Sequence, residues 1–147
     1  MKDVDAEPDQ ETLETEDFYM KAFNEKLGKQ IGYFGTELDV TDSCMRNREA
    51  KMGNFVADLM RTEYATDFAI INSGSFRINK VIPEGPLSML TVQSCFPFPD
   101  TVVVLKMKGY LFKEALEVAV QDWPAEDGKF PHISNVKFLF DPSKPKF

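Results

Sequence analysis

The stretch Phe68-Ala69-Ile70-Ile71-Asn72-Ser73-Gly74-Ser75-Phe76-Arg77 predicts a strand followed at once by a loop. Its first four residues are all apolar, which is typical of a short strand covered on both faces. Residues 72–75 are turn-forming types and predict a loop directly after that strand. Asn72 and Arg77 therefore stand at the end of a buried strand, where α/β proteins commonly bind ligands.

Helical and strand-like patterns alternate on both sides of this stretch. Three segments have apolar residues at helical spacing: 12–27, 49–64 and 110–121. Three others have the apolar runs or alternation typical of strands: 31–40, 101–107 and 135–140. Residues 87–95 contain a short predicted helix. This alternation predicts an α/β (α+β) domain in which helices pack on a mixed sheet.

The charge is distributed unevenly along the chain. Residues 1–17 hold eight acidic residues and one basic residue, which account for the whole formal net charge of −7. We expect residues 1–11 to form an acidic, disordered leader, residues 12–29 a linking helix, and residues 30–147 the folded domain. The body carries no basic stripe, which argues against a nucleic-acid partner. No apolar run approaches the length of a membrane span.

The cysteine and histidine content limits the chemistry of this chain. Cys44 and Cys95 either form one disulfide or remain two thiols, and the sequence leaves both alternatives open. His132 is the only histidine and is expected to be a structural or surface residue. A dinuclear metal centre needs several histidine and carboxylate ligands. We therefore predict no catalytic residue and no metal or other cofactor in this chain.

Other residues favour the binding of an anion and a flat ring. Arg46 and Arg48 precede the helix predicted from residue 49, where the helix dipole favours a negative charge. Phe98 follows Pro97 on a stiffened loop and is suited to stacking on a base. The alternatives are that these arginines are solvated or ion-paired, and that Phe98 belongs to the core.

Three blocks of sequence together indicate a family. Residues 46–58 fit the pattern Arg-x-Arg-Glu-x-x-x-Gly-Asn-x-x-x-Asp, and residues 72–77 fit Asn-x-Gly-x-x-Arg, followed by Gly-x-Leu-Ser at 85–88. Residues 97–117 contain a Pro-Phe pair, then a glycine, a leucine and a Leu-Glu pair. Their order and spacing over about residues 30–142 resemble the C-terminal domain of the 5′-nucleotidase family, which includes ecto-5′-nucleotidase and bacterial UDP-sugar hydrolases.

The resemblance implies a two-domain enzyme. An N-terminal phosphoesterase domain, with two divalent metals of the zinc, manganese or magnesium type, performs the hydrolysis in such enzymes. The C-terminal domain holds the nucleotide. By this resemblance Arg46, Asn72 and Arg77 contact the nucleotide, and Phe98 is one of two aromatic residues that enclose the base. The second aromatic residue lies further along in the family, so we expect residues 30–147 to be an incomplete version of the layered domain.

Our leading hypothesis is the nucleotide-binding domain of a metal-dependent 5′-nucleotidase-type hydrolase, inactive in isolation. Its partners would be a nucleotide or related phosphate ester and an N-terminal metallophosphoesterase domain in the same polypeptide. One alternative is a 2′,3′-cyclic phosphodiesterase or nucleotide-sugar hydrolase of the same family. Another is a non-enzymatic binding module. An exposed sheet edge would also favour a homo-oligomer.

Overall fold

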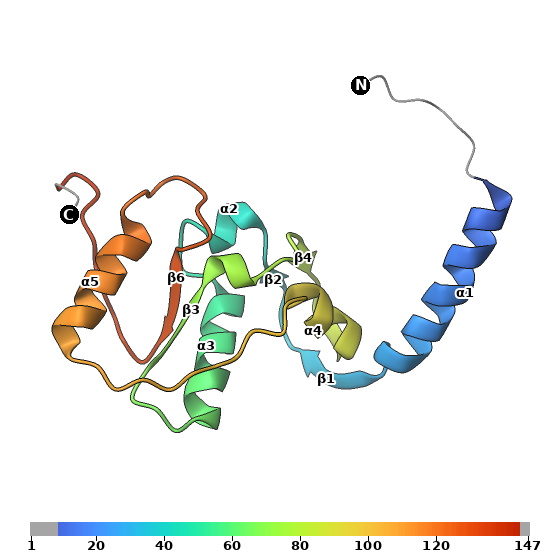
Figure 1. The fold of residues 1–147 in the computed structure, drawn as a ribbon, viewed down its shortest axis with the longest axis horizontal. Helices are drawn as coiled ribbons and strands as arrows, with labels where there is room; N and C mark the ends of the chain where they lie inside the picture. Colours follow the sequence, from blue (N-terminus) through green and yellow to red (C-terminus); the bar gives the residue numbers. More distant parts are fainter. Residues whose placement is uncertain (1–8, 145–147) are drawn as a thin grey trace, which may run out of the picture.

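The computed structural model describes residues 9–144, and Figure 1 shows their arrangement. The helices are α1 (Gln10–Leu27), α2 (Asp42–Met45), α3 (Lys51–Glu63), α4 (Met89–Cys95) and α5 (Gly109–Val120), with a 3₁₀ helix η1 (Ser73–Ser75). The strands are β1 (Gln30–Phe34), β2 (Leu38–Asp39), β3 (Ala69–Asn72), β4 (Val81–Ile82), β5 (Gly85–Ser88) and β6 (Pro131–Ser134).

The strands of the described residues form small antiparallel pairs. β1 pairs with β5, β2 with β4, and β3 with β6. In the last pair Ile71 lies opposite His132, and Asn72 lies opposite Pro131. The α/β class expected from the sequence is confirmed, although these pairs are separate and antiparallel rather than parts of one mixed sheet.

The helix predicted from residue 49 is confirmed as α3, which packs against β3 and β6. Its buried face contains Met52, Gly53 and Ala57. The helix begins after Ala50, whose backbone is extended, and residue Ala65 beyond its end has a positive φ of 48°. Met52 belongs to the main hydrophobic core, which also includes Phe34, Leu38, Val40, Met45, Phe76 and Ile82.

His132 is a structural residue of the core, as expected. It is 1% exposed, and its Nε2 donates a hydrogen bond to the carbonyl oxygen of Met45 at 3.0 Å. A Cβ atom on Gly53 would lie 2.1 Å from Cγ and 2.2 Å from Nδ1 of this ring. Because no side chain fits in that space, the glycine at position 53 allows the imidazole to pack directly on the backbone of α3.

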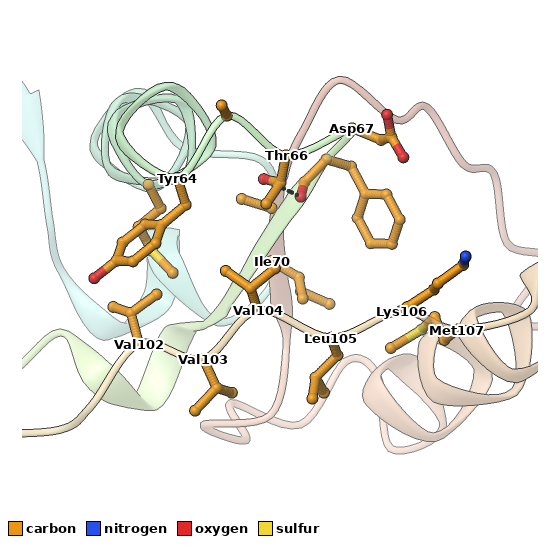
Figure 2. Close-up of a pocket in the computed structure, with 14 residues that line it drawn as sticks. Tyr64, Thr66, Asp67, Ile70, Val102, Val103, Val104, Leu105, Lys106 and Met107 are labelled. Atoms are coloured by element: carbon orange, nitrogen blue, oxygen red, sulfur yellow. Dashed lines mark hydrogen bonds between the residues drawn. The ribbon is translucent and has the colours of Figure 1, made fainter.

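The predicted strand over residues 101–107 is wrong. This segment has no regular secondary structure, and Val103, Val104 and Leu105 are 67%, 58% and 69% exposed. The segment runs past β3 but leaves a hollow of about 530 Å³ between them, lined also by Tyr64 and residues 65–70. Figure 2 shows Val104 and Ile70 among the residues that line this space. The apolar run has the composition of a strand, but pairing also needs a neighbouring strand within hydrogen-bonding distance.

The strand predicted over residues 135–140 is also wrong, because the observed strand β6 lies just before it. β6 ends where Asn135 takes a φ of 62°. The alternation that suggested a strand has a different cause. Phe138 and Phe140 lie on one side of an extended segment, with ring centroids 6.2 Å apart, and Phe140 contacts Trp123. Leu139 between them is fully exposed.

Helix α1 projects away from the other elements (Figure 1). It begins at Gln10, because Asp9 caps it by accepting a hydrogen bond from the backbone N–H of Thr12 at 2.9 Å. The expected acidic leader falls mainly on residues 1–8, which lie outside the described residues. Within residues 9–144, no helix combines the length and apolar character required to cross a membrane.

Substitution of Gly53 tests the packing of His132 on α3. Alanine is favoured over glycine in a helix by about 1 kcal/mol where space is free. Here the added Cβ would overlap the buried ring, so we expect Gly53→Ala to lower the free energy of unfolding by about 1–3 kcal/mol in urea titrations. Gly35→Ala is the matched control, because a Cβ there meets nothing within 4 Å. Equal stability of the two variants would contradict this packing.

The protonation of His132 gives a second test of its burial. Burial lowers the pKa of His132 below its usual value of 6.5, opposed in part by the hydrogen bond to Met45. The unfolded chain therefore binds a proton that the folded core does not, and the free energy of unfolding should fall as the pH drops below 6.5. Because the chain has one histidine, its ¹⁵N resonances can be followed without ambiguity. A titration midpoint at or above 6.5 would refute the burial.

Candidate functional site

The structure brings the four residues predicted to bind substrate together as two pairs. Arg46 and Asn72 both bond to the loop of residues 122–130, which we call the strap. Arg77 and Phe98 contact each other. The strap connects α5 to β6 and passes close to α2 on its way (Figure 1).

Arg46 lies at the C-terminal end of α2. Its Nη2 forms an ion pair with Oδ1 of Asp42 at 3.1 Å, and its Nη1 donates to the carbonyl oxygen of Glu126 at 3.2 Å. Nε is buried and has no hydrogen-bond partner among the described residues. The guanidinium group is thus ion-paired and oriented, while only part of its donor capacity is used.

Asn72 ends β3, as the sequence predicts, but the strand is not covered on both faces, because Ile70 is 39% exposed. Both polar atoms of the Asn72 side chain form hydrogen bonds. Nδ2 donates to the carbonyl oxygen of Gly128 at 3.0 Å, and Oδ1 accepts a hydrogen bond from Oγ of Ser75 at 2.8 Å. The residue is nevertheless exposed. Its amide therefore has a fixed orientation with one N–H and one lone pair left for another molecule.

Arg77 and Phe98 form a cation–π pair. The guanidinium carbon lies 5.2 Å from the centre of the Phe98 ring, within the range of such contacts. Phe98 is 53% exposed, so the alternative that it belongs to the core is wrong. The backbone N–H of Arg77 donates to the carbonyl oxygen of Cys95 at 3.0 Å, which ties the chain at Arg77 to the end of α4.

Arg48, the other arginine before α3, has a carboxylate partner. Its Nη2 lies 3.8 Å from Oδ2 of Asp39, and its side chain is largely exposed. The ion-paired alternative is therefore the one observed for Arg48.

Sequence reasoning missed the strap entirely. Trp123 Nε1 donates to the carbonyl oxygen of Asn47 at 3.0 Å, and Lys129 forms an ion pair with Asp122. The backbone N–H of Ser73 donates to the carbonyl oxygen of Phe130 at 2.8 Å. The glycine at position 128 was the one available sequence signal, and a single glycine predicts only a turn.

The described residues do not form a metal centre. His132 is enclosed in the core, and no group of three or more His, Cys, Asp or Glu side chains in residues 9–144 is arranged to hold a metal ion. Cys44 and Cys95 are separate buried thiols, and burial raises the pKa of Cys95 to about 11. The thiol of Cys95 is therefore protonated at neutral pH and is a poor nucleophile.

Two hollows lie away from these four residues. The hollow in Figure 2 has a mainly aliphatic wall formed by residues 102–107. A second, of about 470 Å³, lies between residues 47–49 and the segment 136–140. Neither contains Arg46, Asn72, Arg77 or Phe98 in its lining. We place the candidate site at these two pairs, because they supply hydrogen-bond donors and an exposed aromatic face.

Comparisons with known proteins identify the family to which most of this chain belongs. Residues 30–147 match the family model described as the 5′-nucleotidase, C-terminal domain. The chain is 27% identical over 142 residues to the Trifunctional nucleotide phosphoesterase protein YfkN of Bacillus subtilis (strain 168), covering 94% of this chain and 10% of that protein. It is 28% identical over 133 residues to the 5′-nucleotidase of Homo sapiens, covering 82% of this chain and 22% of that protein.

A solved structure shows the same fold. The 5′-nucleotidase precursor from Thermus thermophilus superposes with a TM-score of 0.80 at 29% identity, over 93% of this chain and 27% of that one. The chain thus spans from a tenth to about a quarter of the length of these relatives. The family model covers most of the chain, and the fold agrees with it. The chain belongs to the 5′-nucleotidase C-terminal domain family and is homologous to nucleotide phosphoesterases.

Proposed function

We propose that this chain binds a nucleotide as the substrate-binding domain of a metal-dependent 5′-nucleotidase-type hydrolase. The observation that carries the proposal is the arrangement of the four candidate residues. Arg46 and Asn72 are oriented by one loop, and Arg77 and Phe98 form an exposed pair. The family membership of residues 30–147 supports the same assignment.

The two pairs suit the two chemical parts of a nucleotide. Guanidinium and carboxamide donors recognise phosphate and sugar oxygens through directed hydrogen bonds. The exposed ring of Phe98 can stack on a base, an interaction worth about 1–3 kcal/mol per base that tolerates different bases. Arg77 can serve both parts, since it contacts the Phe98 ring and its guanidinium group carries hydrogen-bond donors.

In this proposal a separate metallophosphoesterase domain performs the hydrolysis and holds two divalent metals. The residues described here do not fit such a centre. Helix α1 is suited to connect the two domains, because it stands apart from the other elements (Figure 1) and exposes Phe18 and Tyr19. These aromatic side chains would pack against a neighbouring domain.

The range of substrates includes a second candidate. The alternative to nucleoside 5′-monophosphates is a 2′,3′-cyclic nucleotide or a nucleotide sugar. The relative from Bacillus subtilis is named a trifunctional nucleotide phosphoesterase, which favours more than one nucleotide substrate. The association of two copies also stays a prediction. The exposed apolar segment of residues 102–107 is the feature that favours it.

Nucleotide binding can be tested on this chain by NMR titration. We expect AMP to bind with a Kd of about 1 mM, corresponding to roughly 4 kcal/mol, and to shift resonances of Arg46, Asn72, Arg77 and Phe98. Phe98→Ala should weaken AMP about five- to hundredfold but leave ribose 5-phosphate nearly unchanged, because only the stacking contact is lost. Phe18→Ala on α1 is a control with another exposed ring. An equal effect of Phe98→Ala on both ligands would exclude its role as a base platform.

The absence of hydrolysis by this chain is a separate prediction. Assays with AMP and p-nitrophenyl phosphate in the presence of Mn²⁺, Zn²⁺ or Co²⁺ should give the rate of the buffer control. The physical reason is that residues 9–144 provide no cluster of ligands for a metal. Turnover that survives repeated purification and scales with protein concentration would refute the proposal that a separate domain performs the hydrolysis.

A further inference from the structure

The carbonyl group of Gly128 connects the strap to Asn72 and to the loop that follows it. The oxygen of Gly128 accepts two hydrogen bonds, one from Nδ2 of Asn72 at 3.0 Å and one from the backbone N–H of Gly74 at 2.7 Å. A side-chain contact from Oγ of Ser73 to the carbonyl oxygen of Asp127, at 3.3 Å, lies beside it. The loop after β3 is therefore joined to the strap by both backbone and side-chain bonds.

The two glycines at this junction leave no room for larger residues. A Cβ on Gly128 would lie 3.0 Å from Cα of Gly74. A Cβ on Gly74 would lie 2.9 Å from the oxygen of Gly128 and 3.1 Å from Nδ2 of Asn72. In each case the added Cβ would meet backbone atoms, which cannot move away as the end of a flexible side chain can. The close approach of the two backbones therefore depends on glycine at both positions.

The same strap also holds Arg46. The carbonyl oxygen of Glu126, two residues before Gly128, accepts a hydrogen bond from Nη1. Asp42 fixes the other end of the guanidinium group through Nη2. Two carbonyl groups of one loop thus orient a guanidinium from α2 and a carboxamide from β3, which come from separate parts of the sequence.

We infer that Gly128 is a positioning residue for nucleotide binding, and that the strap holds Asn72 and Arg46 in the orientation that receives the anionic part of the ligand. This inference rests on the proposed function. Gly128 needs no contact with the nucleotide in this role. Its carbonyl group accepts a hydrogen bond from one N–H of Asn72. This bond directs the remaining N–H and the free lone pair of the Asn72 amide outward.

The experiment compares Gly128→Ala with Gly35→Ala, a glycine where an added Cβ meets nothing within 4 Å. NMR spectra of both variants and of the unmodified chain report the side-chain resonances of Asn72 and Arg46. Titrations with AMP and with adenosine, which lacks the phosphate, then measure the consequence for binding. We expect Gly128→Ala to move both side-chain resonances and to weaken AMP about three- to tenfold, while adenosine binding stays unchanged. Gly35→Ala should change neither.

Two results would overturn the inference while the proposed function stands. In the first, AMP shifts the four candidate residues but Gly128→Ala leaves its affinity unchanged. In the second, the variant weakens AMP and adenosine equally, as a general loss of structure would. If AMP shifts none of Arg46, Asn72, Arg77 and Phe98 in the unmodified chain, the proposed function itself fails, and the positioning role fails with it.

A measurement on the unmodified chain keeps the test decisive if Gly128→Ala does not fold. The Nδ2 protons of Asn72 should show one hydrogen-bonded member, with a smaller temperature dependence of its chemical shift than an amide exposed to water. If both protons show the large temperature dependence of a water-exposed amide, the strap does not hold this side chain, and the inference is wrong.

Discussion

The hydrogen bond between the buried ring of His132 and the carbonyl oxygen of Met45 joins the parts of the molecule on which the candidate site depends. His132 belongs to β6, its ring lies on Gly53 of α3, and Met45 immediately precedes Arg46. In the β3–β6 pair His132 stands opposite Ile71, the residue before Asn72. One residue therefore supports the backbone beside both Arg46 and Asn72, through its imidazole at Met45 and through its strand pairing at Ile71. Without the bond to Met45, burial of its polar Nε2 would be costly.

The four candidate residues divide the site into a rigid half and an open half. Arg46 and Asn72 are each held by two hydrogen bonds or ion pairs to neighbouring groups. Arg77 and Phe98 are held mainly by each other, on the surface. This division fits a site in which the anion meets fixed donors and the base meets an adaptable stacking surface.

The sequence predicts those parts of the structure that depend on local pattern. The spacing of Met52, Val56 and Leu59 is sufficient to predict α3, and the apolar run ending at Ile71 is sufficient for β3. Residues 101–107 show where local pattern fails, because whether such a run forms a strand depends on a partner that is distant in sequence. β6 is the reverse case, a strand that forms although its local pattern does not predict one. Its residues Pro131 and His132 are poor strand formers on their own, and burial against α3 and β3 overrides that preference. The strap could not be foreseen either, because its contacts to Arg46 and Asn72 run through backbone carbonyl groups, which every residue has.

The exposed segment next to β3 also has a consequence for handling the protein. Residues 101–105 form a β-prone, uncharged window with valine at three successive positions, and such windows promote aggregation when they are accessible. Asp100 precedes this window, and Lys106 and Lys108 follow it. These charges act as gatekeepers, since a second copy of the segment added in parallel register would bring like charges together. Because salt screens this repulsion, colloidal stability should be greatest at low ionic strength.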